Sequence, residues 1–84
     1  MKDGVYLCFG DKRLTLGSFD DLRRMNMKPE VGLQLTFYDE DADDEGRPVY
    51  LCADGRLCLD VRGNWFAEID EGTFRTVERE QPAG

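Results

Sequence analysis

Six carboxylate side chains fall within the seven residues 39–45. Oxygen ligands of this kind are those that Ca²⁺ and Mg²⁺ prefer, so the run invites comparison with the EF-hand loop. Positions one, three and five would be Asp41, Asp43 and Glu45, but position twelve falls on Cys52, where that loop requires a bidentate Glu. The match covers half a loop without flanking helices. Asp41, Asp43 and Glu45 therefore stay candidates for a Ca²⁺ or Mg²⁺ site, and we expect neither a metal nor another cofactor.

The same acidic run can serve as a docking surface. Like charges this dense repel one another, so the run is predicted to be a solvated loop that attracts a protein partner with a basic surface. The candidate partner-binding residues are Asp39, Glu40, Asp41, Asp43, Asp44 and Glu45, with the aromatic residues Tyr38 and Phe66. The alternatives are the metal-binding loop and an acidic mimic of nucleic acid that inhibits a DNA-binding or RNA-binding protein. With a formal net charge of −7, the chain is not expected to bind nucleic acid directly or anionic membranes.

The residues of covalent catalysis are missing. The sequence has no His, and its only serine, Ser18, is predicted to cap a helix. A pair of carboxylates acting as acid and base needs a cleft between them, which 84 residues rarely provide. We therefore expect no enzyme and no catalytic residues. The three cysteines, Cys8, Cys52 and Cys58, are predicted to be reduced, small buried side chains rather than zinc ligands or disulfides.

Hydrophobic alternation divides the aromatic residues into two groups. The predicted core faces carry Phe9, Phe37 and Trp65, whereas Tyr6, Tyr38 and Phe66 point the other way. The second group forms either an exposed patch that binds a peptide or a second copy of the chain, or a layer covered by the helix residues Phe19 and Leu22. A homodimer is left open.

Two hairpins are predicted to position these residues, because the tetrapeptide Val-Tyr-Leu-Cys occurs at 5–8 and again at 49–52. The first hairpin would pair residues 5–9 with 12–16 through a Gly10-Asp11 turn, and the second would pair 49–53 with 56–59 through a type I′ turn at Asp54-Gly55. These turns would place opposite faces of the tetrapeptide on the core, and a true duplication is left open.

Three further elements are expected. A short helix would begin at Ser18, run through Met25 and end before Lys28-Pro29, and a half-buried strand would cover residues 33–38. A three-residue loop, 62–64, would align Leu57, Leu59 and Val61 with Trp65, Ala67 and Ile69. Residues 73–77 would form a strand or one helical turn.

These elements predict a mainly β fold, either a small SH3-like barrel or a strongly curled antiparallel sheet with one short helix that plugs an open end. The alternative is a two-layer α+β arrangement with the helix across a five-stranded or six-stranded sheet. We expect one domain over residues 1–77 and a disordered polar tail over 78–84. No apolar run approaches the roughly 18 residues that span a bilayer and no signal peptide is evident, so a cytoplasmic location is expected.

The segments Gly32-Leu33-Gln34-Leu35-Thr36-Phe37-Tyr38-Asp39-Glu40-Asp41 and Trp65-Phe66-Ala67-Glu68-Ile69-Asp70 lie within residues 32–70, a stretch of about half the chain. Together they resemble a pattern of short uncharacterised bacterial proteins, in which a strand leads into an acidic loop and a later strand reads Trp-hydrophobic-Ala-x-Ile-Asp. The resemblance implies a bacterial, cytoplasmic protein. It implies no activity and no functional residues.

Overall fold

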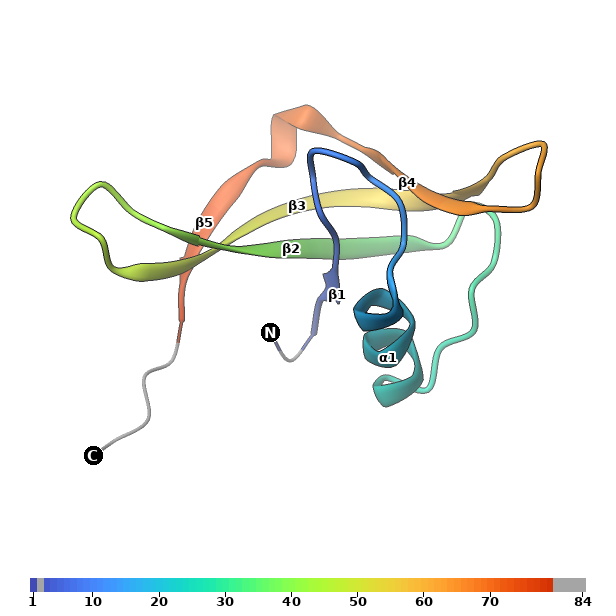
Figure 1. Cartoon of the computed structure of the whole chain (residues 1–84), viewed down its shortest axis with the longest axis horizontal. Helices are drawn as coiled ribbons and strands as arrows, with labels where there is room; N and C mark the ends of the chain where they lie inside the picture. Colours follow the sequence, from blue (N-terminus) through green and yellow to red (C-terminus); the bar gives the residue numbers. More distant parts are fainter. Residues whose placement is uncertain (2, 80–84) are drawn as a thin grey trace.

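The computed structural model describes Met1 and residues 3–79, which form an open, mixed β-sheet of five strands with one α-helix (Figure 1). The elements in chain order are β1 (Val5–Tyr6), α1 (Leu16–Arg24), β2 (Gln34–Ala42), β3 (Pro48–Leu59), β4 (Trp65–Ile69), the 3₁₀ turn η1 (Glu71–Thr73) and β5 (Arg75–Glu78). The prediction of a mainly β chain with a strongly curled sheet and one short helix is confirmed. The sheet is not closed into a barrel, and β1 pairs with β2 in parallel, which the antiparallel prediction missed.

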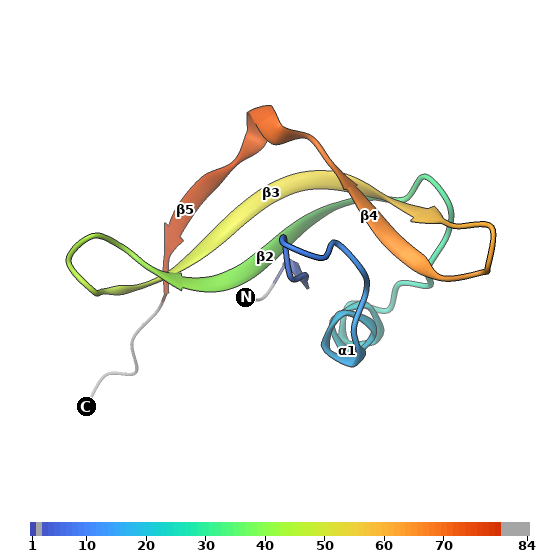
Figure 2. The ribbon, with the colours of Figure 1, turned by 45° about the horizontal axis from the view of Figure 1, so that its top comes forward.

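Strand β3 is the centre of the sheet. It pairs along one edge with β2, and its other edge is shared by β4, opposite Gly55–Leu59, and β5, opposite Val49–Cys52. Where β4 and β5 separate, the backbone of Asp54 bonds to η1 and the residue before it: its N–H donates to Thr73 Oγ1 (2.8 Å) and its carbonyl accepts from Asp70 N–H (2.9 Å). Figure 2 shows the resulting arch of β3 under η1.

The N-terminal residues 5–14, which we name the crossing segment, reach both outer edges of the sheet. At one edge, Leu7 N–H donates to Tyr38 O (2.9 Å). At the other, Ala67 N–H donates to Lys12 O (2.8 Å) and Leu14 N–H donates to Trp65 O (3.2 Å). Leu7 lies between these edges and is fully buried. The core that it joins contains Val5, Leu7, Leu22, Phe37, Leu57 and Ala67.

The ends of α1 are set by side chains. Thr15, not Ser18 as predicted, is the N-cap: its Oγ1 accepts from Ser18 N–H (3.4 Å) while Ser18 Oγ accepts from Thr15 N–H (2.9 Å). At the other end Asn26 adopts a positive φ of 58°, and Met27 N–H donates to Leu22 O (2.9 Å). The helix therefore ends before the Lys28-Pro29 boundary on which the prediction relied.

Both long hairpins close with the same turn. In each, an Asp side chain accepts two backbone N–H groups and a Gly three residues later has a positive φ: Asp43 with Gly46 (79°), and Asp60 with Gly63 (83°). This is the chemistry of a three-residue hairpin loop. The predicted loop length of the β3–β4 hairpin is right, but the loop is 61–63 and not 62–64. Leu57 therefore pairs with Ala67 and Leu59 with Trp65. The side chains still share the predicted face of the sheet, because a shift of two residues in the register leaves each of them on the same side.

Both hairpins proposed around the repeated tetrapeptide are wrong. Residues 12–14 pair with β4, whereas the bond from Lys12 N–H to Cys8 O (2.7 Å) closes a turn and not a strand pair. Asp54-Gly55 lies inside the continuous strand β3. The two tetrapeptides also differ in burial, since Cys8 is exposed and Cys52 is buried, so the structure gives no support to a duplication.

The boundaries of three other segments differ from the predictions or extend them. The acidic run is half strand, because β2 continues to Ala42, and the solvated loop is only the turn that follows. The last element is a strand that continues to Glu78, one residue into the predicted tail; residues 80–84 of that tail lie outside the described part of the chain. Among the described residues, no helix is both long and apolar enough to cross a membrane.

Candidate functional site

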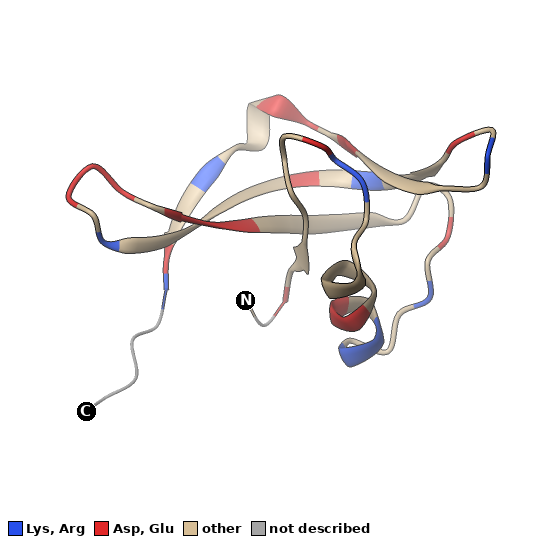
Figure 3. Ribbon diagram, in the orientation of Figure 1, with Lys and Arg blue, Asp and Glu red and all other residues tan. Residues whose placement is uncertain are grey.

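The acidic residues gather on one arm of the molecule, which we name the acidic hairpin and define as residues 39–47. The longest extent of the molecule is 44 Å, and Figure 3 shows this arm projecting at one end of it, with acidic residues in red along β2 and around the turn. Four of the six carboxylates, those of Glu40, Asp41, Asp44 and Glu45, belong to exposed residues. The structure therefore brings the predicted acidic contact residues together on a protruding surface.

The turn of the acidic hairpin is held by Asp43. Its Oδ1 accepts the N–H groups of Glu45 and Arg47, both at 2.9 Å, and its Oδ2 accepts from Arg47 Nε (3.2 Å). The backbone bond from Arg47 is the main cause of a pKa below the ordinary value for the Asp43 carboxyl. The carboxylate of Asp43 is thus occupied in shaping the turn.

Two arginines neutralise part of the arm. Arg47 pairs with Glu45 (2.7 Å) as well as with Asp43, and Arg79 lies 3.7 Å from Glu40. Asp41 and Asp44 form no ion pair within the described residues. The acidic hairpin therefore retains an excess of negative charge at its exposed end.

Asp39 and Asp41 also cover the outer edge of β2. Asp39 Oδ1 accepts Glu40 N–H and Asp41 Oδ1 accepts Ala42 N–H, both at 2.8 Å. These N–H groups point away from β3, so the two side chains occupy donors that an additional strand would otherwise use.

The metal candidates do not form a ligand set. Over residues 1 and 3–79, no group of three or more Asp, Glu or Cys side chains is close enough to hold an ion. Asp43 is bonded to backbone N–H groups and Glu45 to Arg47, whereas Asp41 is bonded to Ala42.

Tyr38 is not an exposed contact residue, contrary to the prediction. It is 8% exposed, its hydroxyl donates to Asp21 Oδ2 (2.9 Å), and its ring meets those of Tyr6 (5.9 Å) and Tyr50 (5.2 Å) edge to face. Burial is the main cause of the raised pKa of Tyr38. Alternation gave the direction of its side chain, but not the helix residue and the two tyrosines that cover it.

Phe66 is half-buried and lies far from Tyr38. Their partners on β3 are Cys58 and Cys52, six residues apart, which corresponds to roughly 20 Å along a strand. The two aromatics therefore belong to different surfaces, and the predicted joint patch does not form.

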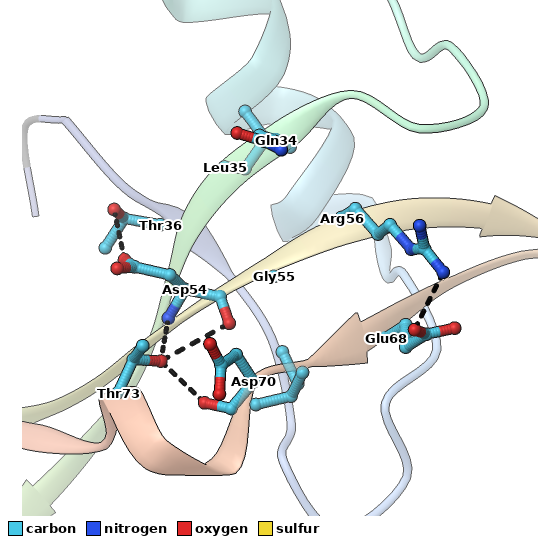
Figure 4. A pocket seen from close by; sticks show the side chains of 10 residues that line it. Gln34, Leu35, Thr36, Asp54, Gly55, Arg56, Glu68, Asp70 and Thr73 are labelled. Atoms are coloured by element: carbon cyan, nitrogen blue, oxygen red, sulfur yellow. Dashed lines mark hydrogen bonds and ion pairs between the residues drawn. The ribbon is translucent and has the colours of Figure 1, made fainter.

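An open pocket of about 670 Å³ lies on the face of the sheet that carries Thr36 and Asp54, which we name the pocket face (Figure 4). Sequence reasoning missed this pocket, because its walls come from strands wrongly split at Asp54-Gly55. Its side chains bond to one another. Asp54 Oδ1 accepts from Thr36 (2.9 Å) and Arg75 (3.1 Å), and Arg56 pairs with Glu68 (2.9 Å). The walls are polar: Asp54 and Glu68 are ion-paired, and the Asp70 carboxylate accepts Gly72 N–H (3.1 Å).

In comparisons with known proteins, the chain matches no protein-family model, no curated protein and no solved structure. The function therefore has to be argued from the geometry of these surfaces.

Proposed function

We propose that this chain is a non-catalytic protein-interaction module that presents the acidic hairpin to a protein with a basic surface. The observation that carries the proposal is the arm itself, which projects from the body of the sheet and carries exposed acidic residues. The side-chain carboxylates of Asp41 and Asp44 form no ion pair among the described residues, although Arg79 Nη2 donates to the backbone carbonyl of Asp41 (2.7 Å). Charges placed in this way accelerate encounter with a basic partner.

The rigid turn supports the same proposal. Asp43 accepts two backbone N–H groups of the turn and forms an ion pair with Arg47, so the backbone that carries the exposed acidic side chains is shaped before a partner arrives. Preorganisation of this kind reduces the entropy lost on binding. Mimicry of nucleic acid needs carboxylates spread along a surface, whereas here they are concentrated on one arm.

The test uses a labelled peptide of Lys-Gly-Ser repeats, which carries positive charge and has little tendency to form a strand. Binding is measured by fluorescence anisotropy at 50 and 300 mM salt for the wild type and for Asp41→Asn/Asp44→Asn. The matched control is Asp20→Asn/Glu30→Gln, which also removes two exposed carboxylates but lies on α1 and the segment after it.

We expect binding to weaken at least about tenfold between the two salt concentrations, because screening acts on exposed charges. The hairpin variant should bind a further two to five times more weakly at low salt, about 0.4–1 kcal/mol, and the control should lose less. Equal losses in the two variants would show that only the net charge matters and would refute the proposal.

A further inference from the structure

The sheet has several edges, and bonds between described residues occupy that of β1, most of that of β4 and the outward N–H groups of β2 beyond β1. At β1, Tyr6 N–H donates to Asp21 Oδ2 (2.9 Å) and Tyr6 O accepts from Ser18 Oγ (2.5 Å). The outer edge of β4 bonds to the crossing segment, and that of β2 beyond β1 is covered by Asp39 and Asp41. An edge that is neither paired nor covered is a template for another strand.

The outer edge of β5 has no such cover. On β3 the backbone N–H and C=O of Asp54 point toward η1, so by alternation those of Cys52 and Tyr50 point toward β5. The backbone groups of their partners Arg75 and Val77 therefore point toward β3. The N–H and C=O of Thr76 therefore point outward, as do those of Glu78. No described residue bonds to these groups, and all four residues of β5 are exposed.

Apolar side chains flank this edge on both faces of the sheet. Phe74 is 41% exposed, and the centre of its ring lies 5.1 Å from that of Phe9. Val77 is 39% exposed and lies on the pocket face beside Tyr50. A strand added to β5 would place alternate side chains against Phe74 and against Val77.

Acidic residues lie at both ends of the edge. Asp70 and Glu71 precede it and are exposed, and Glu78 and Asp41 lie at the other end, where β5 meets the acidic hairpin. The two arginines nearby are already ion-paired, Arg75 with Asp54 and Arg79 with Glu40. The charge therefore favours a segment with basic ends and a β-branched or apolar centre.

We infer that β5 binds an extended basic peptide segment, which joins the sheet as an additional strand at the outward N–H and C=O groups of Thr76 and Glu78. This inference rests on the proposed basic partner and specifies how the partner is held. The acidic hairpin attracts the segment, and the open edge orders it.

The probe is the synthetic peptide Lys-Lys-Thr-Val-Thr-Val-Lys-Lys, with two further versions that are N-methylated at alternate central residues. Only one alternate set of N–H groups in a strand faces its neighbour. One methylated version should therefore lose binding at least about tenfold, and the other should bind like the parent peptide. Equal binding of both versions would mean that charge alone acts and would overturn the inference.

On the protein, Thr76→Pro removes one outward N–H while leaving the bonds to β3 intact, and proline is tolerated at such edge positions. We expect it to weaken binding of the parent peptide about tenfold, whereas the control Thr76→Val, which keeps the N–H, should bind within about twofold of wild type. The methylated peptides test the wild-type protein and so do not depend on the folding of the proline variant.

Amide hydrogen exchange and NMR shifts locate the peptide. Binding should slow the exchange of Thr76 and Glu78 amides and shift the signals of residues 74–78. Shifts confined to the acidic hairpin would overturn strand addition while leaving the proposed function in place. If Asp41→Asn/Asp44→Asn binds normally while Thr76→Pro does not, the proposed function fails and the edge site stands. Concentration-dependent dimers in sedimentation, lost in Thr76→Pro, would show that a second copy occupies the edge and would refute the peptide as occupant.

Discussion

At the scale of single residues, Asp21 joins the helix to two strands through one carboxylate. Its Oδ2 accepts Tyr6 N–H and the Tyr38 hydroxyl, each at 2.9 Å, and its Oδ1 pairs with Arg24 (2.7 Å), while its side chain is 14% exposed. Asp21→Asn keeps the shape but removes the charge from all three bonds. We expect it to lower the free energy of unfolding by about 1–3 kcal/mol, measured by urea denaturation.

The effect of Asp21 should depend on pH. Burial raises the pKa of Asp21, but the bonds from Tyr6, Tyr38 and Arg24 outweigh it and hold that pKa below its ordinary value of 3.8. A carboxyl with a lowered folded-state pKa stabilises the fold above the ordinary value, and that stability is lost as the pH falls through the lowered one. The difference between wild type and Asp21→Asn should therefore shrink below pH 3.8. A comparable loss in the exposed-site control Asp20→Asn would contradict this assignment.

The three cysteines should react at different rates. Cys8 is exposed, Cys58 is half-buried and Cys52 is buried, and burial raises the pKa of the Cys52 thiol. Only Cys52 thus matches the prediction of buried side chains. With a thiol-specific reagent we expect one fast reaction at Cys8, a slower one at Cys58, and none at Cys52 until the protein is unfolded. Persistence of the fast phase in Cys8→Ser would refute this order.

At the scale of elements, Gly55 shows why a turn signal failed. Asp-Gly is a strong hairpin signal, yet Gly55 lies within β3. An added Cβ would clash with the carbonyl oxygen of Glu68 and lie 3.0 Å from Ile69 Cδ1. The glycine is needed for the close approach of β4 and not for a turn, a requirement that depends on a strand still to come in the sequence.

Gly55→Ala should therefore be destabilising. The clash is with the backbone of β4, which cannot move without disturbing its pairing with β3, so we expect a loss of about 1–3 kcal/mol in urea denaturation. Gly10→Ala is the matched control, because nothing lies within 4 Å of the added Cβ and no positive φ is required there. Equal stability of the two variants would show that the backbone of β4 can move away from the added methyl group without loss of stability.

The sequence predicted what local chemistry decides. The exposure of most acidic side chains in residues 39–45, the core position of Phe37 and the shared faces of the β3–β4 hairpin follow from charge and alternation. The turns at Asp43 and Asp60 share a local signal, an Asp with Gly three residues later, but at Asp43 the dense negative charge predicts a solvated loop and hides it. What lay beyond local reasoning were the cover over Tyr38 and the parallel pairing of β1, because both depend on contacts between distant segments.

At the scale of the whole molecule, Leu7 tests the crossing segment. It is fully buried in the core between the two edges that the segment contacts. Leu7→Ala should cost about 2–5 kcal/mol, a large fraction of the stability of a domain this small. Val61→Ala, on a fully exposed side chain, should stay within about 0.5 kcal/mol of wild type. Calorimetry should show one cooperative transition for both, and a separate early transition in Leu7→Ala would mean that the sheet survives without the segment.

The crossing segment also affects how the chain acquires its structure. Residues 5–14 are synthesised before their hydrogen-bond partners, which are Tyr38 on β2 and the much later strand Trp65–Ile69. Contacts this distant along the sequence slow folding relative to helical domains of equal length. During synthesis the apolar residues of the crossing segment therefore stay without their β4 partners until Trp65–Ile69 has been made, so the edge of the sheet that they complete forms after β2, β3 and β4.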